Sequence, residues 1–67
     1  MIKCRLSRIL GDRKMHILDL KRLSKVSYVT LSHLYHEKST RIDFNTIEAI
    51  CKALNIGVGD LFEYIPE

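Results

Sequence analysis

Apolar residues recur along the chain at helical spacing. A first amphipathic helix, which should end near residues 11–13, is indicated by the i, i+4, i+7, i+8 pattern of Ile2, Leu6, Ile9 and Leu10. After it, one helix-start device recurs four times: an apolar residue, a potential N-cap, and an apolar residue four positions past the cap. The sets are Met15–His16–Leu20, Val26–Ser27–Leu31, Ile42–Asp43–Ile47 and Ile56–Gly57–Leu61. In this hydrophobic staple the two apolar residues pack together and fix how the chain enters the helix.

These patterns predict five helices, near residues 2–12, 17–24, 28–36, 44–54 and 58–64. Ser27 and Asp43 are strong caps because their side-chain oxygens accept free amide hydrogens of the first turn, whereas His16 is a poor cap. Asn55 suits a left-handed exit from the fourth helix. No apolar/polar alternation longer than four residues indicates a strand. We therefore expect an all-α fold forming one domain over residues 1–67.

The second and third predicted helices are joined by a very short connection, "SKVS". Helices joined so tightly cross at a steep angle, which is the helix-turn-helix arrangement. Its packing requires apolar residues before and after the turn, and these are supplied by Leu20, Val26, Leu31 and Leu34. A generic small helical bundle can show the same spacing.

Charge is segregated along the chain. Residues 1–41 contain ten Lys and Arg against three Asp and Glu, a net charge of +7, whereas residues 42–67 contain one against five, a net charge of −4. Such segregation favours a cationic surface that meets a polyanion, with the acidic end turned away. The alternative is that the basic residues only solvate exposed helix faces.

Several function classes lack their signatures. No segment approaches the ~18 apolar residues of a membrane span, and "MIKCRLSRIL" has no apolar core of a signal peptide. Cys4 and Cys51 lie far apart, as expected for reduced thiols in a cytoplasmic protein, and a disulfide between them would need an oxidising compartment. His33 and His36 are at most half of a metal site, because no Cys or carboxylate partners are near in sequence. Without a Gly-rich phosphate loop or nucleophile motif, we expect no enzyme, cofactor or metal.

The segments "VSYVTLSHLY", "RIDFNTIEAICKALNI" and "VGDLFEYIPE" resemble the Cro and phage-repressor type of helix-turn-helix protein, the Xre family, and its small free-standing bacterial regulators. The resemblance covers nearly the whole chain and implies a five-helix, lambda-repressor-like DNA-binding domain. Four positions depart from the family pattern: Ile17 replaces a phosphate-binding Gln, Lys21 a small Ala, and Lys25 and Glu37 each a Gly. If Lys25 has a positive φ, it bears roughly 1 kcal/mol of strain.

One face of the third predicted helix has no carboxylate, as a surface facing the DNA major groove requires. Ser32 and His33 can donate to or accept from base edges, and Val29 can pack on a thymine methyl. In similar proteins, base contacts come from the positions matching Tyr28, Val29, Ser32 and His33. Predicted phosphate contacts are Ser27 at the helix start, His36 at its end, and the loop residues Lys38, Thr40 and Arg41, with Ser39 as a further hydroxyl.

Proteins of this type commonly bind two-fold operators as dimers. The expected homodimer interface lies at the C-terminal end, at Phe62, Tyr64 and Ile65, unless these side chains only cover the protein's own helices. The function that follows is a cytoplasmic transcriptional regulator, for example a repressor, that binds double-stranded DNA. Two alternatives stay open: the DNA-binding antitoxin of a toxin–antitoxin pair, and a protein-interaction module using the same helix face. The sequence indicates no particular small-molecule effector.

Overall fold

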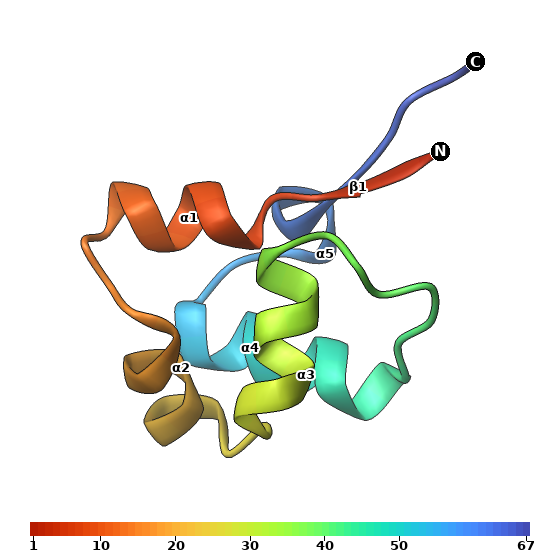
Figure 1. Cartoon of the computed structure of the whole chain (residues 1–67). Coiled ribbons are helices and arrows are strands. Elements are labelled where there is room, and N and C mark those ends of the chain that lie inside the picture. Colours follow the sequence, from red (N-terminus) through yellow and green to blue (C-terminus); the bar gives the residue numbers. More distant parts are fainter.

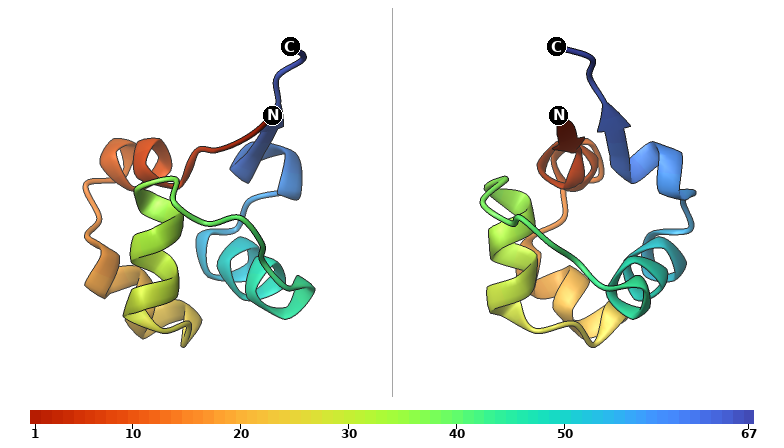
Figure 2. Two further views of the ribbon diagram at one scale, coloured as in Figure 1. Left: turned by 45° about the vertical axis from the view of Figure 1, so that its right-hand side comes forward. Right: turned by 90° about the vertical axis from the view of Figure 1, so that its right-hand side faces the viewer.

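The computed structural model describes residues 1–67. Its elements, in chain order, are β1 (Ile2–Cys4), α1 (Leu6–Asp12), α2 (Ile17–Ser24), α3 (Tyr28–Tyr35), α4 (Phe44–Leu54), α5 (Val58–Leu61) and β2 (Phe62–Tyr64). Five helices surround a common centre, and both ends of the chain lie on the same side of the molecule, away from the turn between α2 and α3 (Figures 1 and 2).

The starts of α2, α3, α4 and α5 confirm the predicted caps. Ser27 accepts a hydrogen bond from the amide of Thr30 at 3.2 Å, and Asp43 accepts one from the amide of Thr46 at 2.8 Å. His16, the poor cap, is indeed the N-cap of α2, but its side chain makes no hydrogen bond at the helix start.

The two helices with weak caps are stabilised from their third residue instead. The Asp19 carboxylate accepts from the amide of His16 at 2.9 Å, and the Asp60 carboxylate accepts from the amide of Gly57 at 3.0 Å. A carboxylate near a helix start is also favoured by the helix dipole. Acidic residues one turn into α2 and α5 thus perform the capping that His16 and Gly57 cannot.

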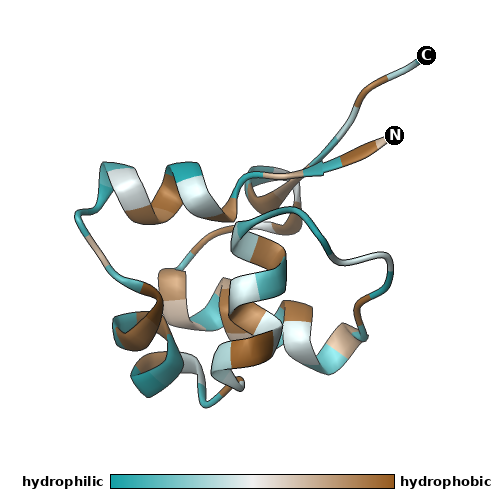
Figure 3. Ribbon diagram, viewed as in Figure 1, coloured by the Kyte–Doolittle hydropathy of each residue, from teal (hydrophilic) through white to brown (hydrophobic).

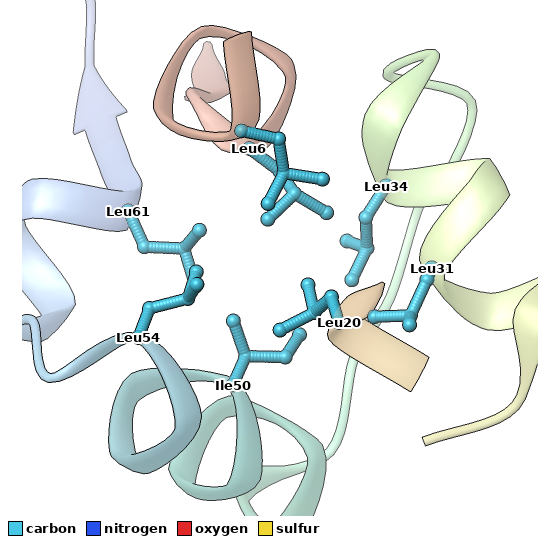
Figure 4. Packing of buried hydrophobic residues seen from close by; sticks show 8 residues of the cluster. Leu6, Leu20, Leu31, Leu34, Ile50, Leu54 and Leu61 are labelled. Atoms are coloured by element: carbon cyan, nitrogen blue, oxygen red, sulfur yellow. The ribbon is translucent and has the colours of Figure 1, made fainter. Parts of the chain in front are cut away.

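Every helix contributes to one apolar core. Its fully or almost fully buried members are Leu6, Leu10, Leu20, Leu31, Leu34, Ile50, Leu54 and Leu61 (Figure 4). Along the helices, hydrophobic and hydrophilic segments alternate, as expected when only one side faces the core (Figure 3). The first residue of each predicted staple, at positions 15, 26, 42 and 56, packs against this core.

The two ends of the chain correct the all-α prediction. Residues 2–4 form β1 rather than the start of the first helix, and the fifth helix ends at Leu61 rather than at residue 64. The two strands pair antiparallel, with Ile2 opposite Tyr64 and Cys4 opposite Phe62. Consequently Ile2 is 64% exposed instead of lying in the core. The fold is mostly helical, with one small two-stranded sheet.

An ion pair closes this sheet. The guanidinium of Arg5 lies 2.7 Å from the Glu63 carboxylate, and the Arg5 amide donates to the carbonyl of Leu61 at 2.8 Å. These contacts join residues almost sixty positions apart, so no local sequence pattern reveals them. Arg5 is therefore engaged within the fold and does not only solvate an exposed helix face.

Candidate nucleic-acid interface

The turn between α2 and α3 is held by hydrogen bonds from its own residues. The Ser24 hydroxyl donates to the carbonyl of Leu20 at 2.7 Å and accepts from the amide of Val26 at 3.2 Å. Lys25 has φ 65° and ψ 13°, and its amide donates to the carbonyl of Lys21 at 2.9 Å. Lys25 therefore has the positive φ for which strain is expected. Val26 then packs against the core and directs the chain into α3.

The two sides of α3 differ as the sequence predicted. Leu31 and Leu34 are buried in the core, and Tyr35 packs partly against it. The opposite side lies at one edge of the molecule with no element of the chain outside it (Figure 2, right). On that side Tyr28 is 45% and Val29 63% exposed. The helix therefore offers a free surface along its length.

This surface combines polar and apolar side chains and carries no acidic residue. His33 and His36 are exposed, Ser32 is half-buried, and none of the residues of α3 is a carboxylate. The ring of His36 rests edge-on against Tyr35, with centroids 5.1 Å apart. We call the set Tyr28, Val29, Ser32 and His33 the outer face of α3.

The start of α3 restricts what Ser27 can do. Its hydroxyl accepts from the amide of Thr30 and donates to the Thr30 hydroxyl at 2.9 Å. Its proton is thus directed along the helix rather than outward. The first two amides of α3, those of Tyr28 and Val29, have no acceptor within the helix and remain the better donors to an anion at this end.

At the other end of α3, residues 36–43 form a loop that is exposed except at Ile42, which packs against the core. The amide of Lys38 donates to the carbonyl of His33 at 2.8 Å, which fixes the beginning of the loop against the helix. Lys38, Thr40 and Arg41 are exposed, and neither cation makes an ion pair. Arg41 lines an open hollow together with Thr30 of α3. The predicted phosphate-binding residues of the loop are therefore accessible and beside α3.

A family model for Cro/C1-type helix-turn-helix DNA-binding domains matches residues 5–67. The chain belongs to this family. Among known proteins it is similar to the uncharacterized HTH-type transcriptional regulator YozG of Bacillus subtilis (strain 168), with 39% identity over 56 residues. The alignment covers 84% of this chain and 67% of YozG. Membership assigns the chain to the DNA-binding helix-turn-helix regulators.

In this Cro/C1-type domain, most acidic residues of the C-terminal part form hydrogen bonds or ion pairs within the fold. Hydrogen bonds from the side chain and amide of Thr46 hold the pKa of Asp43 below its ordinary value, and the Arg5 side chain does the same for the pKa of Glu63. Asp60 accepts from the amide of Gly57. These carboxylates serve helix starts and the sheet, and none of them forms an ion pair with Lys38 or Arg41.

Sequence reasoning missed a second group of cations in the domain. Lys21 and Arg22 near the end of α2, and Lys25 in the turn, line one open hollow with Ser27. Lys21 and Lys25 make no ion pair, whereas Arg22 lies 3.9 Å from Asp19. The spacing of Lys21 and Lys25, one helical turn apart beside the predicted turn, is the signal that would have found them.

Several other residues considered from sequence have structural roles away from the outer face of α3. Ile17, at the family's Gln position, packs against the core. The guanidinium of Arg13 donates to the carbonyl of Leu54 at 2.6 Å and so satisfies the end of α4. Cys4 and Cys51 are free thiols whose pKa values burial raises, which keeps them protonated. No three His, Cys, Asp or Glu residues are grouped as metal ligands, and no helix has the length and apolarity to span a membrane.

Proposed function

We propose that this protein is a sequence-specific regulator of transcription that places α3 in the major groove of double-stranded DNA. The observation that carries the proposal is the outer face of α3: it is exposed, free of carboxylates, and mounted on a helix-turn-helix of the Cro/C1 type. The major groove admits an α-helix, and base pairs are distinguished there by edge donors, acceptors and the thymine methyl.

Base recognition falls to Tyr28, Val29, Ser32 and His33. Val29 is the apolar member and offers contact with a thymine methyl, while His33 can donate to or accept from a base edge. Tyr28, in the first turn, reaches either a base or the sugar–phosphate backbone. Ser32 is half-buried, so its hydroxyl reaches the least far towards a base. The exposed imidazole of His33 therefore carries the largest share of the sequence preference.

Phosphate contacts fix the position of α3 and supply most of the affinity. They come from Ser27 with the adjoining amides, from His36, and from the loop residues Lys38, Thr40 and Arg41. If about four phosphates are contacted per subunit, log Kobs falls with log salt with a slope of roughly −3.6 per subunit and about twice that for a dimer. The two uncompensated cations of the loop support this assignment.

The protein acts as a homodimer on a two-fold operator. Of the interface residues proposed from sequence, Tyr64 is 69% exposed, Ile65 is partly buried, and Phe62 packs partly against the protein's own core. The exposed Ile2 lies opposite Tyr64 in the sheet and extends the same apolar surface. Tyr64 and Ile2 therefore form its centre, and sedimentation at several concentrations tests the assembly.

In the cell, the protein works in the cytoplasm by occupying an operator and excluding or recruiting polymerase. The test is selection from a pool of random duplex DNA, followed by fluorescence anisotropy titrations of the recovered duplex at several salt concentrations. Recovery of a two-fold-related motif is the expected result. Failure to enrich any duplex at low ionic strength contradicts the proposal.

His33→Ala is the decisive variant for the outer face. It should weaken binding to the selected duplex by ~1–3 kcal/mol, the range of one base contact, and should change the preference at one base pair. His16→Ala is the matched control, because His16 is exposed and its side chain makes no cap hydrogen bond. A protein-interaction module, the rival role of the same face, would show neither the steep salt dependence nor the effect of His33 on a DNA probe.

A further inference from the structure

Cations flank the outer face of α3 at both of its ends. At the C-terminal end are Lys38 and Arg41 of the loop. At the N-terminal end are Lys21 and Lys25, which share an open hollow with Ser27, the N-cap of α3. All four side chains are exposed and without an acidic partner. The two groups are separated by a helix of 8 residues.

The distance between the two groups of cations, set by the length of α3, matches the width of the DNA major groove. At 1.5 Å per residue, an eight-residue helix is about 12 Å long. The major groove is also about 12 Å wide, and a row of phosphates borders it on each side. Cations at the two ends of a helix in the groove can therefore meet phosphates of opposite strands.

We propose that Lys21 and Lys25 form a second phosphate-binding surface, which holds the strand opposite to the one contacted by Lys38 and Arg41. The inference rests on the proposed function, DNA binding through α3. Both lysines stand where the family pattern has small residues, Ala and Gly, so the general pattern does not account for their charge. Arg22 lines the same hollow, but Asp19 at 3.9 Å partly neutralises it, and we assign it no phosphate.

The position of Lys25 supports a binding role over solvation alone. A lysine that only solvates the surface can occupy any exposed site, whereas this one stands in a left-handed turn that glycine fits without strain. Its ammonium has no partner within the protein. A phosphate beside Ser27 would supply the missing partner.

The experiment compares salt dependences of binding to the duplex selected above. Lys21→Ala and Lys25→Gly, made singly, should each reduce the magnitude of the salt slope by about 0.9 per subunit. Over a fourfold rise in salt, each variant then loses roughly 3.5-fold less affinity than the unmodified protein does. The double variant should show both reductions. Binding to unrelated duplexes should weaken by the same factor, because phosphate contacts carry no base information.

Two further variants are matched controls. Lys52→Ala removes one positive charge from α4, on the acidic part of the chain, and should leave the slope unchanged. Lys25→Arg retains the charge and the backbone strain, and should retain the slope. Lys21→Ala places the best helix former within α2, so it tests the surface even if the turn variant were to misfold.

The outcomes separate the two proposals. A steep salt slope in the unmodified protein, reduced by Lys21→Ala and Lys25→Gly but not by Lys52→Ala, supports the second phosphate surface. Slopes for the first two variants equal to that of Lys52→Ala overturn it while DNA binding stands. Absence of duplex binding by the unmodified protein overturns the proposed function, and this inference with it.

Discussion

Replacing Lys25 by glycine should stabilise the fold, although it removes a side chain. Lys25 is left-handed, with φ 65°, at the end of α2. Its side chain is exposed and makes neither a hydrogen bond nor an ion pair within the protein. Its amide bond to the carbonyl of Lys21 is retained by glycine. The substitution therefore relieves strain without removing an intramolecular contact.

The magnitude follows from two opposing terms. The left-handed conformation costs an L-residue roughly 1–2 kcal/mol. Glycine loses more backbone entropy on folding, at a cost of roughly 0.5–1 kcal/mol. The net stabilisation is about 0.5–1 kcal/mol, and for a domain of this size it raises Tm by roughly 3–6 °C. In urea, with an m-value of about 1 kcal/mol/M for a small protein, the midpoint should rise by roughly 0.5–1 M.

The assay is a urea titration followed by circular dichroism, with Lys21→Gly as the matched control. Lys21 lies within α2, where glycine costs about 1 kcal/mol relative to alanine, so the same replacement four residues earlier should destabilise the fold. A higher urea midpoint for Lys25→Gly together with a lower one for Lys21→Gly identifies the backbone conformation of Lys25 as the cause of the change in stability. A lower midpoint for Lys25→Gly, with an unchanged m-value, would show that the left-handed turn carries no strain and would refute the reasoning.

Three further variants test other parts of the molecule. Glu37→Gly relieves the same kind of strain, at φ 56°, and removes an acid beside the phosphate loop; a higher Tm should come with tighter, not weaker, duplex binding. Asp43→Ala removes the cap of α4 and should cost about 1 kcal/mol in urea titrations; an unchanged midpoint contradicts the cap. Because Arg5 lowers the pKa of Glu63, that ion pair stabilises the fold above about pH 4.5 and is lost as the pH falls through the folded-state value. Glu63→Gln should therefore melt below the unmodified protein at pH 7 but together with it in strong acid, and a constant gap in Tm would exclude the ion pair as the cause.

Helix starts were predictable from sequence because their determinants are local. Each staple and its cap lie within six residues of one another, and α2, α3, α4 and α5 begin at the predicted positions. The left-handed conformation of Asn55 was also foreseen, since it directly follows a helix, and that of Lys25 matches the Gly of the family pattern at this position. For the same reason, the two faces of α3 follow from the 3.6-residue period alone.

The ends of the chain were not predictable, because what decides them is remote in sequence. Ile2 fits a helical pattern with Leu6, but pairing with Tyr64 makes it part of a strand. In the sequence, Arg5 and Arg13 resemble ordinary surface cations. In the fold, Arg5 pairs with Glu63 and Arg13 donates to the carbonyl of Leu54. These interactions depend on tertiary contacts. Their effect on the site is direct: they remove two cations from those available to DNA.

One of the cations that remain available, Lys25, has a left-handed backbone conformation. Each connection between consecutive helices contains one left-handed residue that is not glycine: Lys14, Lys25, Glu37 and Asn55. None of the glycines has a positive φ, so the chain does not place glycine where it is conformationally favoured. At Asn55 the conformation is well tolerated, and stability alone explains the residue. At Lys25 stability argues against the residue, and the phosphate contact proposed above would compensate the strain. A phosphate beside the start of α3 is such a contact. Lys25→Gly should therefore gain stability and, at the same time, lose affinity for duplex DNA.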